Sequence, residues 1–330
     1  MRKFGCAALA AVASVAFCAS AAAQSGYKLV KTIDLPGDKG GHGDWTTFDP
    51  GTNTVWISQS PDHNVVVIDA VAMTVKGVIP GIEEGNGIAL TPRYGFLADA
   101  KGGVVVVVDK KSLKKVATLH PQGKEPDSVN YLAKEDEIFV NAESDDITIF
   151  KAKPPFAEVT HFRLPPDPPK DGLDVALYVP AKNRLYQPID NVVDVIDPAH
   201  WKVTASWKPG FEGSAKPIVY DGKTGHFILG TTAKKMLVLD GRSGKVLAEI
   251  PVQGAVDETV LDEKARRAFV GDKAGVVEVI DLDHDKIVDT IASEKNVHTL
   301  AVDPKTHAVF VYRNESNKVD VFVPQKMAAK

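Results

Sequence analysis

Polar side chains recur at one position of a repeating pattern in this 330-residue sequence. In each repeat the position lies five residues before a turn that follows a short, strand-like segment. It is occupied by Asp44, Asn86, Asp127, Asp174, Lys216, Asp257 and His298. Carboxylate oxygens are preferred ligands of Ca²⁺ and Mg²⁺, so the candidate metal ligands are Asp44, Asp127, Asp174 and Asp257. The same side chains could instead bind a cationic or hydroxylated small molecule.

Two histidines at or near this position are candidates for proton transfer. His42 lies in the glycine-rich segment Gly40–Asp44, where glycines would let the backbone approach a ligand. His298 is itself the seventh member of the set. If a bound cation polarised a substrate carbonyl, His42 or His298 could act as general acid or base. Three further carboxylates could belong to the same acidic surface: Glu84, Glu125 and Glu258.

A purely structural role would explain the same seven residues. Asp and Asn side chains bond backbone amides in turns, and a water-filled channel tolerates polar walls without any ligand. The variation among Asp, Asn, Lys and His favours binding slightly, because one repeated structural bond would more often repeat one residue type. The sequence leaves both interpretations open. It contains no phosphate-binding loop, zinc-protease helix motif or serine nucleophile elbow.

Seven apolar runs divide the chain into units of nearly equal length. The runs end at Asp69, Asp109, Lys151, Asp197, Asp240, Asp281 and Val323, so successive ends are 40 to 46 residues apart. A steady period in this range, built from short strands and tight turns, indicates a β-propeller. We predict an all-β, seven-bladed β-propeller with four-stranded antiparallel blades. The inner strands should line a central channel, with the seven polar residues in a ring near its mouth.

The first blade illustrates the repeat. His42–Phe48 is the expected inner strand, followed by Val55–Ser58, Val65–Ile68 and the outer strand Thr74–Ile79. The last repeat ends after only three strands. Tyr27–Leu35 matches the outer strands of the other blades, so we expect it to complete the last blade and close the ring, which removes an exposed edge.

One family resemblance emerges from these residues. The segment Asp49-Pro50-Gly51-Thr52-Asn53-Thr54-Val55-Trp56-Ile57-Ser58, followed by Val65–Asp69, resembles the YVTN-type propeller repeat of bacterial surface and periplasmic proteins, including YncE-like proteins. The likeness covers nearly the whole chain after its first residues. It implies the propeller fold. It does not fix a function, because this architecture hosts binding proteins, lactonases, lyases and dehydrogenase subunits.

The first 23 residues are typical of a secretory signal peptide. Arg2 and Lys3 precede the apolar stretch Phe4–Ala19, and Ala21-Ala22-Ala23 provides small residues before a cleavage site. Residues 24–330 are then expected to form a single propeller domain, located in the periplasm or secreted. Both cysteines, Cys6 and Cys18, fall within the signal peptide, which leaves no thiol for disulfides or thiolate metal sites.

Charge limits the partners that the sequence favours. Loss of Arg2 and Lys3 with the signal peptide lowers the net charge from −4 to −6. This acidity argues against nucleic acid as a partner. No second apolar stretch follows, so no membrane span is expected after signal cleavage. A small molecule or an envelope protein is the expected partner of a monomer, and a divalent cation (Ca²⁺ or Mg²⁺) is the one cofactor that the residues suggest.

Three functions are compatible with these features. The first is a non-catalytic exported propeller that binds a small ligand, a cation or an envelope protein at the mouth of its channel. The second is a metal-assisted hydrolase, lactonase or lyase acting at the same mouth. The third is a subunit of a periplasmic redox complex, similar in shape to amine dehydrogenase heavy chains, in which a partner would supply any redox centre.

Overall fold

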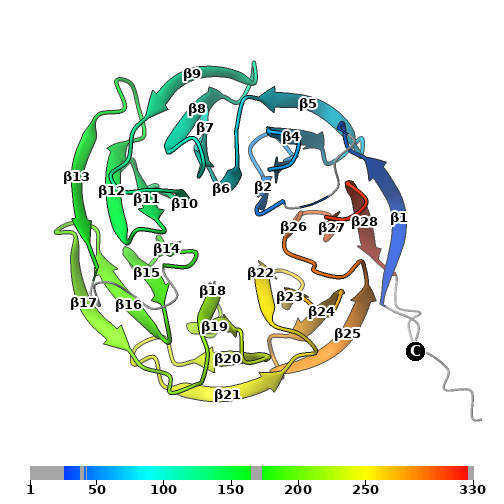
Figure 1. Ribbon diagram of the computed structural model, residues 1–330. Helices are drawn as coiled ribbons and strands as arrows, with labels where there is room; N and C mark the ends of the chain where they lie inside the picture. Colours follow the sequence, from blue (N-terminus) through cyan, green and yellow to red (C-terminus); the bar gives the residue numbers. More distant parts are fainter. Residues whose placement is uncertain (1–25, 38–40, 42, 165–172, 326–330) are drawn as a thin grey trace, which may run out of the picture.

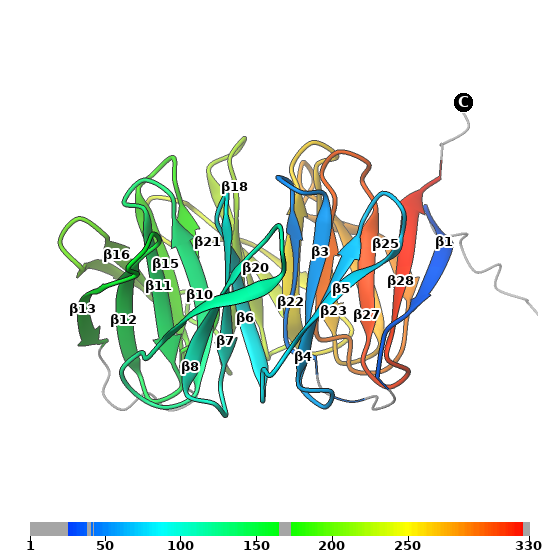
Figure 2. The same cartoon turned by 90° about the horizontal axis from the view of Figure 1, so that it is seen from above.

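The computed structural model describes residues 26–37, 41, 43–164 and 173–325. These residues form seven four-stranded antiparallel sheets arranged as the blades of a closed disc (Figure 1). Turned on edge, the disc has two faces that carry the loops (Figure 2). No helix occurs within the described ranges. The prediction of an all-β, seven-bladed β-propeller is confirmed.

Each blade runs from an inner strand at the centre of the disc to an outer strand at its rim. The first three blades are β2–β5 (Thr46–Asp49, Thr54–Gln59, Asn64–Asp69, Thr74–Pro80), β6–β9 (Gly85–Leu90, Tyr94–Asp99, Val104–Asp109, Lys114–Leu119) and β10–β13 (Pro126–Leu132, Glu137–Ala142, Asp146–Lys151, Glu158–Arg163). The next three are β14–β17 (Leu177–Val179, Arg184–Ile189, Val192–Asp197, Lys202–Trp207), β18–β21 (Ala215–Asp221, His226–Thr231, Lys235–Leu239, Val246–Pro251) and β22–β25 (Val256–Asp262, Arg267–Asp272, Val276–Asp281, Lys286–Ala292). The seventh consists of β26–β28 (Leu300–Val302, Val309–Arg313, Lys318–Pro324) and β1 (Tyr27–Asp34).

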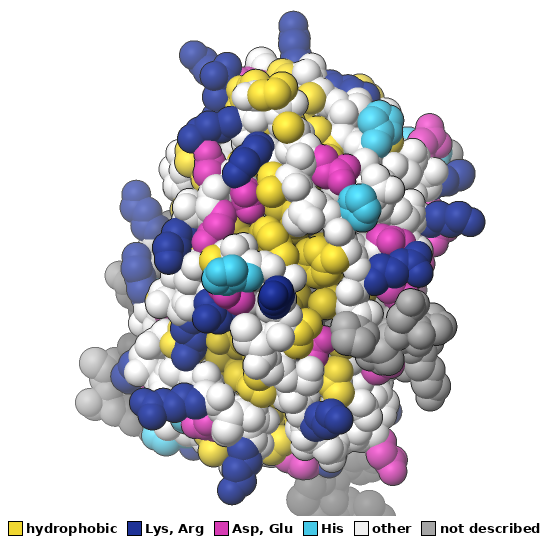
Figure 3. All heavy atoms as spheres, turned by 90° about the vertical axis from the view of Figure 1, so that its left-hand side faces the viewer, with side chains coloured by type: hydrophobic (Ala, Val, Ile, Leu, Met, Phe, Trp, Pro, Cys, Tyr) yellow, Lys and Arg dark blue, Asp and Glu magenta, His cyan; other side chains and the backbone are white. Residues whose placement is uncertain are grey.

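Burial follows the position of a strand within its blade. The second strand of the first blade, β3, is buried along its whole length, because both of its faces pack against neighbouring blades. The outer strands alternate between covered and exposed side chains, as in β5. On one flank of the rim, apolar side chains lie between charged side chains of both signs (Figure 3).

The N-terminal strand closes the ring, as predicted. β1 pairs antiparallel with β28, with Tyr27 opposite Pro324 and Asp34 opposite Lys318. Ile33 and Leu35 are buried in the core between the seventh and first blades. The first and last strands of the described part of the chain therefore share one sheet.

The inner strands of three blades are shorter than the repeat suggests. The first begins at Thr46 and not at His42, and His42 lies outside the described residues. In the first, fourth and seventh blades the ring residues Asp44, Asp174 and His298 precede the inner strand. Gly43 explains the irregular start of the first blade, because its Cα lies so close to Tyr312 and to the Ser58 carbonyl that a side chain would clash.

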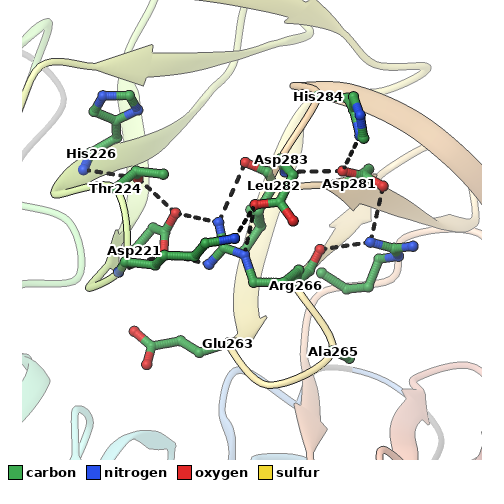
Figure 4. Close-up of polar contacts among 12 residues, drawn as sticks. Asp221, Thr224, His226, Glu263, Ala265, Arg266, Asp281, Leu282, Asp283 and His284 are labelled. Carbon is green, nitrogen blue, oxygen red and sulfur yellow. Dashed lines mark hydrogen bonds and ion pairs between the residues drawn. The ribbon is translucent and has the colours of Figure 1, made fainter.

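Charged side chains join adjacent blades on the face opposite the polar ring. Arg266, in the sixth blade, donates to both carboxylate oxygens of Asp221 in the fifth at 2.6 and 2.7 Å, and to Asp283 at 3.0 Å (Figure 4). Burial alone would raise the pKa of Asp221, but hydrogen bonds from Arg266 and Thr224 outweigh it and lower the pKa to about 2.

A buried ion pair and a histidine–carboxylate contact join blades in the same way. Lys110 of the second blade lies 2.6 Å from Asp49 of the first, and both side chains are buried. His307 of the seventh blade lies 2.6 Å from Asp262 of the sixth. These contacts join elements about 40 to 60 residues apart, so they fix the blades relative to one another.

The proposed signal peptide, residues 1–23, lies outside the described residues. Within the part of the chain that the structure describes, no helix is long and apolar enough to cross a membrane.

Candidate functional site

The structure brings the recurring polar residues together at one face of the disc. Contacts run around the centre from blade to blade: Asn86 to Asp127, Lys216 to Asp174 and Asp257, and His298 to Asp257. Asp44 lies close enough to Asp127 for its charge to raise the pKa of Asp127. We call these seven residues the polar ring. Whether the ring binds a ligand stays a prediction.

β-Bulges shape four of these positions. In β6, β10, β18 and β22 the pairing with the second strand shifts register around the ring residue. In β10, for example, Pro126 faces Ala142 and Val129 faces Val140, so an extra residue is accommodated between them. A bulge re-aims the side chain that it contains. Asp127 is accordingly half-buried, while its neighbours Pro126 and Ser128 are buried.

Buried amides and hydroxyls hold the backbone of the ring in place. Ser58 Oγ donates to the Asn86 carbonyl at 2.8 Å. Asn141 Nδ2 and Gln187 Nε2 donate to the Asp174 carbonyl at 3.0 and 2.6 Å. All three donors lie near the C-terminal ends of second strands, on the side of the polar ring, where polar residues interrupt apolar runs. This polar interruption of an apolar run is a signal in the sequence that marks the buried donors.

One half of the ring is internally neutralised. Lys216 Nζ lies 2.8 Å from Asp174 and 4.0 Å from Asp257. Asp257 also contacts His298 Nδ1 and lies 3.8 Å from Lys273, a residue that the sequence analysis did not identify. Burial alone would lower the pKa of Lys216, but these carboxylates outweigh it and raise the pKa above its usual range. Lys216 therefore stays a cation.

The other half of the ring adjoins an acidic cavity. A pocket of about 420 Å³ lies between the second and third blades, beside Asn86. We call it the acidic pocket because Glu84, Glu125 and Glu143 line it, together with Lys101 and Lys124. Glu84 and Glu125 were predicted as members of an acidic mouth. Glu143 was missed, because it lies in the loop between β11 and β12 and not next to an inner strand.

Carboxylates in this half repel one another. Burial, reinforced by Asp44, Asp174 and Glu143, raises the pKa of Asp127 well above its usual range. Burial also raises the pKa of Glu143, and a hydrogen bond and charge repulsion from Glu125 add to the effect. Lys216 offsets only part of this effect at Asp127, so additional positive charge would favour ionisation of Asp127 and Glu143.

Glu258 is a buried acid directly beside the ring. Thr259 N donates to one carboxylate oxygen at 2.9 Å, and Thr299 Oγ1 donates to the other at 3.4 Å. Burial raises the pKa of Glu258 to about 8, with a further contribution from Asp257, Asp174 and Asp44. The side chain is thus protonated near neutral pH.

Glu258 should make the protein less stable as the pH rises. The pKa of Glu258 is about 8 in the folded protein and near 4.5 in the unfolded chain. Between these pH values the unfolded chain loses the proton while the folded protein keeps it, so the free energy of unfolding falls as the pH rises. We expect Glu258→Gln to match the wild type near pH 5 and to exceed it by roughly 3 kcal/mol near pH 8. Urea unfolding at the two pH values measures this, with the exposed Glu249→Gln as control. An identical pH dependence in wild type and Glu258→Gln would contradict the assignment.

The predicted cation site has no preformed cage. Among residues 26–37, 41, 43–164 and 173–325, no group of three or more His, Asp or Glu side chains is placed to hold a metal ion. A site made by Asp44, Asp127, Asp174 and Asp257 would require their side chains to move, because Lys216 and His298 occupy two of them. The cation site stays a prediction.

Comparisons with known proteins identify the fold and no family. No family model and no curated protein matches the sequence. Many solved chains share the backbone arrangement, among them a chain of hydrazine synthase from Kuenenia stuttgartiensis. That chain superposes with a TM-score of 0.76 over 88% of this chain and 97% of its own, at 16% sequence identity. The likeness shows a shared β-propeller fold, and the YVTN-type resemblance stays a prediction.

Proposed function

We propose that this chain is an exported, YncE-like β-propeller that binds a small cation, metallic or organic, at the acidic half of its polar ring. The uneven charge around the ring carries the proposal. On one side, Lys216 and Lys273 compensate Asp174 and Asp257, and His298 contacts Asp257. On the other side, Asp127 is hydrogen-bonded to Asn86 and repelled by Glu143. Asn86 and Glu143 both line a 420 Å³ cavity, a volume suited to a small ligand.

Ionisation links this site to pH. A bound cation would stabilise the charged forms of Asp127 and Glu143, whose pKa values are raised without it. Binding should therefore release protons, and the affinity should rise with pH until these carboxyl groups are ionised. A cation held only by ordinary surface carboxylates would show no such dependence above about pH 5.

Titration calorimetry with three probes, Ca²⁺, Mg²⁺ and putrescine, tests the proposal. We expect at least one probe to bind more tightly at pH 8 than at pH 6, with proton release revealed by buffers of different ionisation enthalpy. Asp127→Asn or Glu143→Gln should weaken binding roughly tenfold, because each removes a charge-assisted contact. Glu249→Gln, on the outer strand β21, is the matched control and should leave affinity unchanged.

The three probes separate the sources of the positive charge. Tight binding of Ca²⁺ or Mg²⁺ alone would identify a metal site, and binding of putrescine alone would identify an organic ammonium ligand. Failure of all three to bind, or equal affinity in wild type, Asp127→Asn and Glu143→Gln, would overturn the proposal.

A metal-assisted hydrolase, lactonase or lyase is the second candidate. The contact between His298 Nδ1 and Asp257 favours it, because a carboxylate can orient an imidazole for proton transfer. This second candidate function requires a metal-dependent activity that is abolished both by EDTA and by His298→Ala. A role as a subunit of a periplasmic redox complex is supported only by the fold likeness to the hydrazine synthase chain, so it stays a hypothesis.

A further inference from the structure

A second concave surface lies on the face opposite the polar ring. It consists of two adjoining depressions of about 490 and 540 Å³, which share Pro92 and Arg93. Asn86 is near the start of β6, whereas Pro92 and Arg93 follow its end, so the length of that strand separates the two sites by roughly 15–20 Å. We call the two depressions together the turn-face groove. The turns after β6, β8, β10 and β12 supply most of it, and Figure 1 labels these strands.

The first depression has apolar walls. Tyr94, Tyr131, Pro92, Ala152 and Pro154 line it. Tyr94 packs edge-on against Phe156, with ring centroids 5.2 Å apart, so this wall is fixed by the core. Such a surface suits a flat, apolar group.

Hydrogen bonds orient the second tyrosine. Tyr131 Oη donates to Asp136 Oδ1 at 3.0 Å, and Lys153 Nζ lies 2.5 Å from the other oxygen of Asp136. The charge of Asp136 is therefore compensated by groups within the wall. The ring of Tyr131 is left facing the depression that it lines.

The second depression is basic. Lys76, Arg93, Lys110 and Lys111 line it, against a single carboxylate, Asp109. Asp49 neutralises Lys110, and Arg93 lies 3.5 Å from Asp109. Lys76 and Lys111 are exposed, and within the described ranges neither side chain makes an ion pair. Positive charge thus remains here, on a chain whose net charge is negative.

Arg93 lies where the two depressions meet. Its guanidinium carbon is 5.0 Å from the centre of the Tyr94 ring, and 73% of its side chain is exposed. It can therefore contact an apolar group on one side and an anionic group on the other. Pro92 is the other residue that lines both depressions, and it carries no charge.

We propose that the turn-face groove binds a small amphipathic anion, with an aromatic body against Tyr94 and Tyr131 and an acidic group against Arg93 and Lys111. The ligand class is an aromatic carboxylate, sulfonate or phosphate. This site is independent of the cation site proposed at the polar ring. It would give the propeller two ligand sites of opposite charge preference, one on each face.

Fluorescence titration with 1-anilinonaphthalene-8-sulfonate tests the proposal on the full folded protein. We expect saturable binding of one molecule per chain, and weaker binding of its uncharged parent, N-phenyl-1-naphthylamine. Arg93→Gln should weaken sulfonate binding roughly tenfold, because a charge-assisted contact is lost, and Arg93→Lys should recover part of it. Lys115→Gln, an exposed lysine on β9 outside the groove, is the matched control.

Three results of the sulfonate titrations would overturn the proposal. These are absence of saturable sulfonate binding, equal affinity for wild type and Arg93→Gln, and equal loss in Arg93→Gln and Lys115→Gln. Binding of poly-L-glutamate without binding of the sulfonate would also overturn it, in favour of an acidic protein partner. An unchanged melting temperature shows that Arg93→Gln is folded, and Asp127→Asn should bind the sulfonate normally.

Discussion

A chain that begins at Pro36, and so lacks β1, is expected to melt roughly 8 °C below the full chain. Ile33 and Leu35 are buried against the cores of the seventh and first blades, and each should contribute about 2–3 kcal/mol. A loss of about 5 kcal/mol lowers the melting temperature by roughly 8 °C in a domain of about 300 residues. The deletion also exposes the edge of β28, which invites aggregation.

A peptide added in trans makes this test specific. A synthetic peptide of residues 26–37 should raise the melting temperature of the shortened protein in a concentration-dependent way, because it can pair with β28. A scrambled peptide should not. Leu29→Thr in the full chain is the control for an exposed position of the same strand, and should change stability by less than about 0.5 kcal/mol. An unaltered melting temperature after deletion would refute closure of the ring by β1.

Replacement of Lys110 by Met is expected to destabilise the protein by about 3–5 kcal/mol. Lys110 Nζ lies 2.6 Å from Asp49, and the two side chains are 4% and 5% exposed. Loss of the lysine leaves a buried carboxylate whose other partners are Gly51 N and Thr52 Oγ1. These hydrogen bonds do not offset the cost of burying a charge.

A double-mutant cycle separates the pair from the lysine alone. Asp49→Asn combined with Lys110→Met should be less destabilised than the sum of the single variants by more than about 1 kcal/mol, because no unpaired charge is then buried. Lys114→Met, four residues away on the exposed strand β9, should be nearly neutral. Urea unfolding provides all four free energies. Additive effects would show that Lys110 and Asp49 do not act as a pair.

The regularity of the repeat explains why the fold could be predicted. Apolar runs ending at Asp69, Asp109 and their equivalents mark the third strand of each blade, and five of the seven third strands end at those positions. The other two, β20 and β28, end one residue before Asp240 and one residue beyond Val323. The inner strands were predicted less well, because strand pairing there is broken by bulges and by irregular starts such as Gly43.

By itself, the sequence determined the number of blades, their four-strand composition, the closure by Tyr27–Leu35 and the seven positions of the polar ring. These features depend on local alternation and turn chemistry, repeated seven times, so each repeat supports the others. Only the tertiary structure decided that Lys216 neutralises carboxylates in one half of the ring and that His298 contacts Asp257 there, while Glu143 joins the acidic half. It also decided that Arg93 joins two depressions on the opposite face. Such contacts link residues from different blades, and their distances depend on strand twist, bulges and side-chain reach, which no local pattern records.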